Sequence, residues 1–158
     1  MSEAFIALGS NLENPIQQIQ KAFEELTLIP KTHLVKQSSL YQSAPVGRLD
    51  QPDFINAVGQ IETTLTPYEL FSELMAIEQM HGRKRESLNA PRTLDLDLLL
   101  YDDLVSQDKR LTIPHPRMFQ RAFVLIPLLE IAPNHSIPGY GFIAQLTDHC
   151  KEQELKII

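Results

Sequence analysis

The chain has 158 residues, of which 43% are hydrophobic and 22% charged, as expected for one globular domain over residues 1–158 and not for a disordered chain. Its net charge of −6 argues against a general nucleic-acid or membrane-surface binder, and its single cysteine, Cys150, excludes an internal disulfide. The first residues lack the basic stretch of a signal peptide, and no apolar run approaches the ~20 residues that span a bilayer. We therefore expect a soluble, cytoplasmic protein.

Alternation of apolar residues predicts four main strands, over residues 4–8, 33–41, 53–65 and 93–100. A short hairpin arm at Leu104 and Val105 follows the last of them. A loop is then expected to continue to Pro116.

Two helices are expected between these strands. Asn14 and Pro15 are typical of a helix N-cap and first helical position, and Thr66 with Glu69 forms the pattern of a capping box. Two further helical segments are expected over residues 118–130 and 142–154. The resulting order, βαββαβ, predicts an α+β, ferredoxin-like antiparallel sheet with helices on one face and a C-terminal helical appendage.

The strand at residues 93–100 carries two aspartates, a residue type that strands disfavour. Because side chains alternate along a strand, Asp95 and Asp97 share one face with Thr93 and Leu99. The other face carries four leucines that we expect in the core: Leu94, Leu96, Leu98 and Leu100. Two residues along a strand span roughly 6.5 Å, so the two carboxylates can converge on one cation or bracket two. From the spacing alone, a half-exposed sheet with an acidic outer face is the simpler explanation.

The acidic pair lies inside the one basic segment of this acidic protein. Residues 83–121 hold eight of the fourteen basic residues and six of the twenty acidic ones, a net charge of +2 against −8 for the remainder. A site for a metal polyphosphate needs carboxylates for Mg²⁺ and basic side chains for phosphate oxygens. A chance charge cluster on a solvated face is the alternative.

The common nucleotide and metal motifs are absent from the sequence. There is no G-x-x-x-x-G-K-[ST], no G-x-G-x-x-G and no G-x-S-x-G, and the five histidines lack the spacing of a zinc site. ATP would therefore have to bind by another route. The basic-segment candidates for its phosphates are Arg83, Lys84, Arg85, Arg92, Lys109, Arg110, His115 and Arg121. Any one of them, taken singly, is more simply a solvated surface charge.

Five ordered blocks give the sequence a resemblance to a known family. They are Ala-Leu-Gly-Ser-Asn-Leu (7–12), Asp-Gln-Pro-Asp-Phe-Ile-Asn-Ala (50–57), Pro-Arg-Thr-Leu-Asp-Leu-Asp (91–97), Leu-Thr-Ile-Pro-His-Pro (111–116) and Phe-Val-Leu-Ile-Pro-Leu-Leu-Glu-Ile-Ala-Pro (123–133). Together they resemble 6-hydroxymethyl-7,8-dihydropterin pyrophosphokinase of folate biosynthesis. The resemblance implies transfer of pyrophosphate from ATP to the pterin hydroxymethyl group, with release of AMP. It also implies a ferredoxin-like fold.

The resemblance implies a role for each matching residue. Asp95 and Asp97 would bind two Mg²⁺ ions that arrive with ATP, and together with Arg83 and Arg92 they would form the catalytic set. The matching positions for ATP are Glu78, Arg83, Arg85, Arg92, Leu98 (backbone), Arg110, Thr112, His115 and Arg121. Those for the pterin are Ser43, Val46, Phe54, Asn56 and Phe123. Two phenyl rings suit stacking on a flat heteroaromatic ring, and a carboxamide suits its donor–acceptor edge.

Some positions depart from the family pattern. The chain has no tryptophan in the loop before residue 91, and Phe54 replaces a common tyrosine. Without the resemblance, Phe54 and Phe123 would be read as core residues and Asn56 as a polar group at a strand edge.

Two other interpretations share the predicted fold. A ferredoxin-like small-molecule sensor would bind a ligand without needing paired metal carboxylates. An RNA-recognition module would need paired aromatics on its central strands and a basic face, and the acidic balance argues against it. We expect a monomer that binds ATP and the pterin, and neither nucleic acid nor a membrane.

Overall fold

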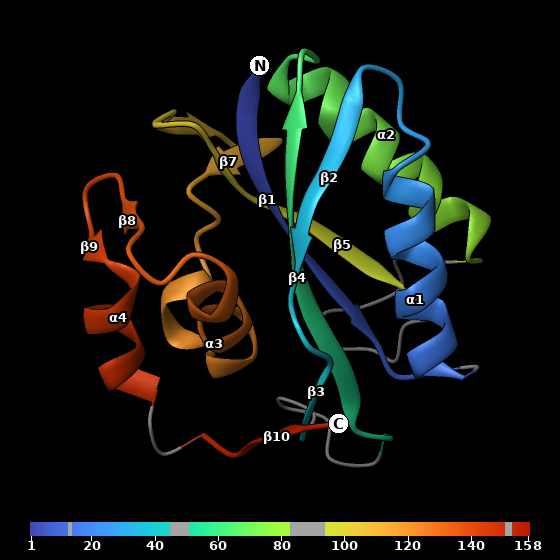
Figure 1. Ribbon diagram of the computed structural model, residues 1–158, viewed down its shortest axis with the longest axis vertical. Helices are drawn as coiled ribbons and strands as arrows, with labels where there is room; N and C mark the ends of the chain where they lie inside the picture. Colours follow the sequence, from blue (N-terminus) through green and yellow to red (C-terminus); the bar gives the residue numbers. More distant parts are fainter. Residues whose placement is uncertain (13, 45–50, 83–93, 151–152) are drawn as a thin grey trace.

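An antiparallel sheet forms the centre of the protein (Figure 1). The computed structural model describes residues 1–12, 14–44, 51–82, 94–150 and 153–158. The six strands that the described residues contribute to this sheet are β1 (Ser2–Ser10), β2 (Thr32–Gln37), β3 (Tyr41–Ser43), β4 (Phe54–Thr63), β5 (Asp95–Tyr101) and β10 (Leu155–Ile157). Their order is β10-β3-β4-β1-β5, with β2 also pairing to β4, and every pairing is antiparallel.

Helices cover both faces of this sheet. The described residues form four α-helices, α1 (Pro15–Leu26), α2 (Pro67–Met80), α3 (Ala122–Ile131) and α4 (Ile143–Leu146), and two 3₁₀ segments, η1 (Met118–Gln120) and η2 (Thr147–Cys150). Two small hairpins pair β6 (Ser106–Asp108) with β7 (Leu111–Ile113) and β8 (Ser136–Ile137) with β9 (Gly141–Phe142). Figure 1 shows α1 and α2 on one side of the sheet and α3 and α4 on the other. The C-terminal appendage is thus the layer that covers the second face.

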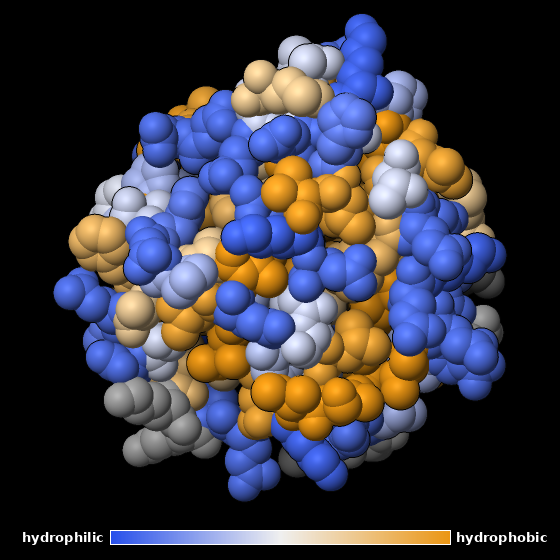
Figure 2. Space-filling model, viewed as in Figure 1, coloured by the Kyte–Doolittle hydropathy of each residue, from blue (hydrophilic) through white to orange (hydrophobic). Residues whose placement is uncertain are grey.

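Each face of the sheet has its own hydrophobic core. Leu8, Phe23 and Leu74 belong to the core under α1 and α2, and Phe5 and Leu125 to the core under α3 and α4. In Figure 2 hydrophobic side chains reach the surface mainly across the middle and lower part of the view. Hydrophilic side chains cover most of the outline. No helix among the described residues is long and apolar enough to cross a membrane.

The helix starts largely follow the sequence prediction. The Thr66 hydroxyl accepts a hydrogen bond from the Glu69 backbone N–H at 3.2 Å, and the Glu69 carboxylate accepts one from the Thr66 N–H at 2.9 Å, which completes the capping box. Pro15 begins α1 as expected. Asn14 occupies the N-cap position, as predicted, with φ 63° and without a capping hydrogen bond from its side chain.

The strand predicted over residues 33–41 is two strands. β2 pairs with the second half of β4 and β3 with the first half, so one long strand supports both. Between them, Ser38 donates its N–H to the Val58 carbonyl at 2.9 Å, and its hydroxyl accepts the Val58 N–H at 2.9 Å. These bonds satisfy the backbone of β4 at the point where the partner strand changes.

Three C-terminal predictions were wrong. The expected helix over residues 142–154 is divided into α4 and η2, and the chain then forms an edge strand, β10, that the sequence pattern did not predict. The loop expected before Pro116 contains β7, and the hairpin arm begins at Ser106, after Leu104 and Val105. These elements depend on pairing with distant segments, which local periodicity does not report.

A β-bulge changes the face on which the end of β5 lies. Leu94, Leu96 and Leu98 belong to the core under α1 and α2, as predicted. The register against β1 shifts between Phe5 and Ile6, because Phe5 pairs with Leu100 and Ile6 with Leu98. Leu99 and Leu100 therefore both lie in the other core, and the expectation for Leu100 was wrong.

Candidate functional site

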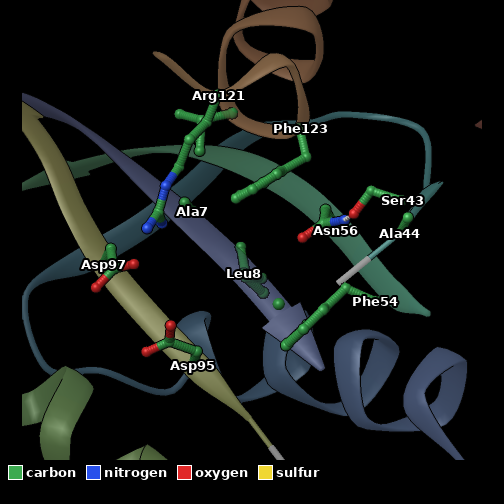
Figure 3. A pocket seen from close by; sticks show the side chains of 12 residues that line it. Ala7, Leu8, Ser43, Ala44, Phe54, Asn56, Asp95, Asp97, Arg121 and Phe123 are labelled. Carbon is green, nitrogen blue, oxygen red and sulfur yellow. Dashed lines mark hydrogen bonds between the residues drawn. The ribbon is translucent and has the colours of Figure 1, made fainter. Parts of the chain in front are cut away.

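A hollow opens on the α3 side of the sheet, where the ends of several strands meet that helix (Figure 3). Its lining comes from β1, β3, β4, β5 and α3 and from residues next to them: Ala7, Leu8, Gly9, Ser43, Ala44, Phe54, Asn56, Asp95, Asp97, Arg121, Phe123 and Val124. Seven of the sequence-predicted site residues are in this set. Strand alternation brings them together, since Phe54 and Asn56 of β4 share a face, as do Asp95 and Asp97 of β5.

One part of the hollow is aromatic and amide-lined. Phe123 extends into it from α3 and Phe54 from the start of β4, so that the two rings approach from opposite sides (Figure 3). Beside them, Asn56 is 5% exposed and donates its Nδ2 hydrogen to Ser43 Oγ at 2.7 Å. This bond holds the carboxamide at the pocket wall. Both phenylalanines are half-buried and line the hollow, so neither is a fully buried core residue, although Phe123 also packs against the core under α3 and α4.

The hollow is small in this conformation, about 50 Å³. Pockets for ligands of drug size usually have at least ~300 Å³. A second hollow of about 620 Å³ adjoins it and shares Ser43, Ala44, Arg121 and Phe123 with it.

The opposite part of the hollow is charged. Asp95 and Asp97 project from β5, and the Arg121 side chain extends toward them from the start of α3 (Figure 3). The Arg121 Cζ also lies 5.2 Å from the centre of the Phe123 ring, within cation–π range. One arginine thus faces both the acidic pair and the aromatic wall.

His115 lies next to the acidic pair as a neutral imidazole. Burial is the largest cause that lowers its pKa, and the positive charges of Arg121 and Arg117 lower it further. The negative charge of Asp95 raises the pKa in part, and the result is a pKa of about 4. Its Nδ1 accepts a hydrogen bond from the Arg117 N–H at 3.3 Å, so in the neutral ring the proton is on Nε2. Nε2 lies 3.7 Å from Asp97 Oδ1. The ring can therefore offer an N–H donor to an oxygen bound beside the aspartates.

Glu78 supports β5, the strand that carries the two aspartates. Its side chain comes from α2, is 2% exposed, and accepts the Leu96 backbone N–H at 2.8 Å. Leu96 stands between the two aspartates, so this bond fixes the backbone on which both are mounted. The contact satisfies an N–H at the outer edge of β5 that would otherwise be buried without an acceptor.

The other predicted ATP residues lie elsewhere. The Leu98 side chain is buried in the core under α1 and α2, and Thr112 on β7 donates to the Asp108 carbonyl at 3.0 Å. Arg110 is exposed, 3.7 Å from Asp108 and 5.6 Å from the Tyr68 ring centre. None of these three is in the lining of the hollow. Four predicted site residues lie outside the described part of the chain: Val46, Arg83, Arg85 and Arg92.

Gly9 is a site residue that sequence reasoning did not select. A Cβ at this position would lie 3.4 Å from Asn56 Oδ1, so glycine gives the carboxamide room at the pocket wall. A glycine at the end of an apolar strand was the available clue, because such a glycine often marks a close approach.

Among the described residues, no three His, Cys, Asp or Glu side chains cluster as a complete metal site. The carboxylates of Asp95 and Asp97 are the pair in the hollow that could contribute to one. A hard cation held there would need its remaining ligands from water or from a bound substrate.

Comparisons with known proteins agree with this geometry. A family model described as 7,8-dihydro-6-hydroxymethylpterin-pyrophosphokinase (HPPK) matches residues 5–133. The 2-amino-4-hydroxy-6-hydroxymethyldihydropteridine pyrophosphokinase of Haemophilus influenzae is 45% identical over 155 residues, 98% of this chain and 97% of that protein. The protein of the same name from Pseudomonas aeruginosa is 43% identical over 150 residues, 95% of this chain and 93% of that protein.

Solved structures show the same fold at low sequence identity. A wild-type HPPK-DHPS of Plasmodium falciparum with pterin and p-hydroxybenzoate superposes with a TM-score of 0.73 at 14% identity, covering 93% of this chain and 42% of that one. This chain therefore spans less than half the length of that structure's chain. The blocks that suggested the family lie within or next to the matched residues, and the resemblance is confirmed: the chain belongs to the 7,8-dihydro-6-hydroxymethylpterin-pyrophosphokinase family.

Proposed function

We propose that this protein transfers pyrophosphate from ATP to the hydroxymethyl group of 6-hydroxymethyl-7,8-dihydropterin, with release of AMP, in folate biosynthesis. Membership of the family supports the reaction, and the two-part hollow is the structural observation that carries it. An aromatic and amide part suits a pterin ring, and a charged part next to it suits phosphate. The enzyme would thus be a transferase that binds ATP and the pterin side by side.

In this assignment the pterin lies between Phe54 and Phe123, and Asn56 pairs with its polar edge. Asn56 is suited to this because its Nδ2 bond to Ser43 fixes the orientation of the amide and leaves Oδ1 directed at the Gly9 side of the hollow. Val46 is included in the pterin set on family grounds alone.

We assign Asp95 and Asp97 to Mg²⁺ ions that arrive with ATP. The absence of a third carboxylate, His or Cys cluster member among the described residues fits this cation, which is usually held by one or two carboxylates plus substrate phosphates. Bound there, Mg²⁺ supplies charge neutralisation on phosphate oxygens. Arg121, which extends toward the aspartates, and the Nε2–H of His115, 3.7 Å from Asp97 Oδ1, would contact phosphate oxygens.

The remaining family positions complete the ATP site as proposed. Arg83, Arg85, Arg92 and Arg110 would contact phosphates or the loop that covers them, and Thr112 and the Leu98 backbone would lie near the nucleoside. For Glu78 the structure favours a supporting role, since its buried carboxylate already accepts the Leu96 N–H.

The reaction needs one bond made and one broken. The hydroxymethyl oxygen bonds to the β-phosphorus while the bond from that phosphorus to the α-phosphate oxygen breaks, and AMP leaves with the electron pair. The hydroxyl proton passes to solvent. Among the described residues no strong base adjoins the hollow, because the pKa of His115 is about 4. Positioning and charge neutralisation would therefore carry the rate.

Nucleotide analysis tests this assignment. The protein mixed with Mg-ATP and 6-hydroxymethyl-7,8-dihydropterin should give AMP and pyrophosphorylated pterin in equal amounts, and neither without the pterin. Release of ADP would contradict the assignment. Pterin binding without turnover would support a sensor instead.

Three broader assignments belong with this proposal. The strand order and the βαββαβ succession support a ferredoxin-like class for the core, with β2 and β3 together serving as its second strand. We also propose a monomeric and cytoplasmic protein. Light scattering after size exclusion and cell fractionation would test these two.

A further inference from the structure

Gln153, in the C-terminal tail, makes hydrogen bonds on both sides of Arg121. Its Oε1 accepts the Ala122 backbone N–H at 2.9 Å, and its Nε2 donates to the Gln120 carbonyl at 2.7 Å. A backbone N–H can only donate and a carbonyl can only accept, so the two partners fix the orientation of the amide without ambiguity. A single side chain, 31 residues away in sequence, thus joins the end of η1 to the start of α3.

This contact replaces a local helix cap. Arg121 is the N-cap residue of α3 and makes no side-chain capping bond, and the first turn of the helix contains no acidic residue. The first N–H groups of a helix lack partners within the helix and are usually satisfied by a nearby side chain. Here the acceptor for Ala122 is Gln153. The tail thus supplies the acceptor for the first N–H of α3.

The two residues held by this contact form opposite parts of the hollow. Arg121 faces the acidic pair, and Phe123 forms one aromatic wall (Figure 3). They are separated by Ala122, the residue whose N–H Gln153 accepts. A displacement of this short segment would move both side chains together, since the Arg121 Cζ lies only 5.2 Å from the Phe123 ring centre.

The tail also supports the other wall of the hollow. Directly after Gln153, β10 pairs with β3, and Leu155 is in register with Ser43. Ser43 in turn accepts the Asn56 amide hydrogen. A second, open hollow of about 620 Å³ lies between the tail and α3, and it shares Ser43, Ala44, Arg121 and Phe123 with the first. The tail is thus in contact with both sides of the substrate site.

We propose that Gln153 is a positioning residue, which holds Arg121 and Phe123 in the arrangement that the reaction requires. The inference rests on the proposed function, because it assumes that these two side chains contact phosphate and pterin. Gln153 lies beyond the residues 5–133 that the family model matches.

Three substitutions separate hydrogen bonding from space filling. Gln153→Ala removes both bonds, Gln153→Met keeps the length of the side chain without the bonds, and Gln153→Glu keeps the acceptor for Ala122. Gln20→Ala, at an exposed glutamine on α1 across the sheet, is the matched control. Steady-state kinetics would be measured for both substrates well below the Tm of every variant, with the Kd for Mg-ATP measured separately.

Gln153→Ala and Gln153→Met should each raise the pterin KM about tenfold and lower kcat, a factor that corresponds to ~1.4 kcal/mol, typical of lost hydrogen bonds. Gln153→Glu should lie between them and the wild type, and Gln20→Ala should match the wild type. The Kd for Mg-ATP should also rise, but by a smaller factor than the pterin KM, because Arg121 is one of several proposed phosphate contacts and most of the others lie on other elements.

Four results would overturn the inference. The first two are wild-type kinetics for Gln153→Ala and wild-type kinetics for Gln153→Met. The third is an equal loss for both substrates. The fourth is a lowered Tm with unchanged KM and kcat, which would assign Gln153 to stability only. Failure of the proposed function would be seen separately, as a wild-type protein that makes no AMP.

Discussion

The buried contact between Glu25 and His81 allows a sharp test of how α1 and α2 are held together. His81 ends α2, and its Nε2 contacts Glu25 Oε1 while its Nδ1 contacts Gln18 Oε1, both on α1. Each of Glu25 and His81 is 9% exposed. Glu25→Ala removes one partner of a buried pair and leaves a ring nitrogen of His81 without its acceptor.

The expected loss can be estimated by comparing three effects. Leaving a buried polar group without its hydrogen-bond partner costs about 1–3 kcal/mol, whereas an exposed pair contributes only ~0.2–1 kcal/mol. The better helix propensity of alanine offsets less than ~0.7 kcal/mol of that loss. We expect Glu25→Ala to lower the free energy of unfolding by ~2 kcal/mol. With a urea m-value of ~2 kcal/mol/M, the unfolding midpoint should fall by ~1 M.

Urea unfolding followed by circular dichroism measures this loss, and the chain offers a matched control. Glu24 is the neighbouring residue on α1 and is exposed, so Glu24→Ala should change stability by less than ~0.5 kcal/mol. Glu25→Gln keeps the size and an acceptor oxygen, and should lose less than Glu25→Ala. The reasoning is refuted if Glu25→Ala and Glu24→Ala unfold at the same urea concentration.

Three other outcomes follow from the structure. Asp95→Asn and Asp97→Asn should each lower turnover by about 10²–10³-fold. The free energy of unfolding should change by less than ~1 kcal/mol, since each substitution relieves repulsion between the two carboxylates. Near-normal turnover in either variant would contradict the metal assignment. Gly59→Ala should lower the free energy of unfolding in urea by ~1–3 kcal/mol, because the new Cβ would lie 3.0 Å from Phe23 Cε1. Adding Phe23→Leu to that variant should restore part of the loss. Burial raises the pKa of Glu130, but hydrogen bonds from Tyr41 and Ser39 outweigh it and leave the pKa below 4.5. The ionised Glu130 should therefore stabilise the fold fully above pH 4.5, and this stabilisation should be lost as the pH falls through the folded-state pKa. When the free energy of unfolding is plotted against pH, the curves of the wild type and of Glu130→Gln should converge in acid.

The elements that sequence predicted well are those determined by neighbouring residues. The capping box of Thr66 and Glu69 depends on residues three apart, and Pro15 at the first position of α1 depends on its own ring. In contrast, β10 exists because Leu155–Ile157 pairs with Tyr41–Ser43, more than a hundred residues earlier. No local pattern contains that information.

The same distinction applies to the site. Asp95 and Asp97 were found because strand alternation places two acids on one face, and Phe54, Asn56 and Phe123 were found through family blocks. Gln153 was missed because its partners are the backbone groups of Gln120 and Ala122. Every residue type at those two positions except proline would offer the same backbone groups, so the sequence there gives no indication of the contact. A role that depends on folded proximity to main chain becomes visible only in three dimensions.

The bulge in β5 separates this strand into two parts with different tolerance to changes of length. Between Leu94 and Leu98 the alternation is strict, so inserting or removing one residue would turn the aspartates into the core and bring leucines into the hollow. Beyond Leu98 an extra residue is already accommodated, and Leu99 and Leu100 pack on the same side. A change of chain length beyond Leu100 would therefore leave the orientation of the acidic pair unchanged.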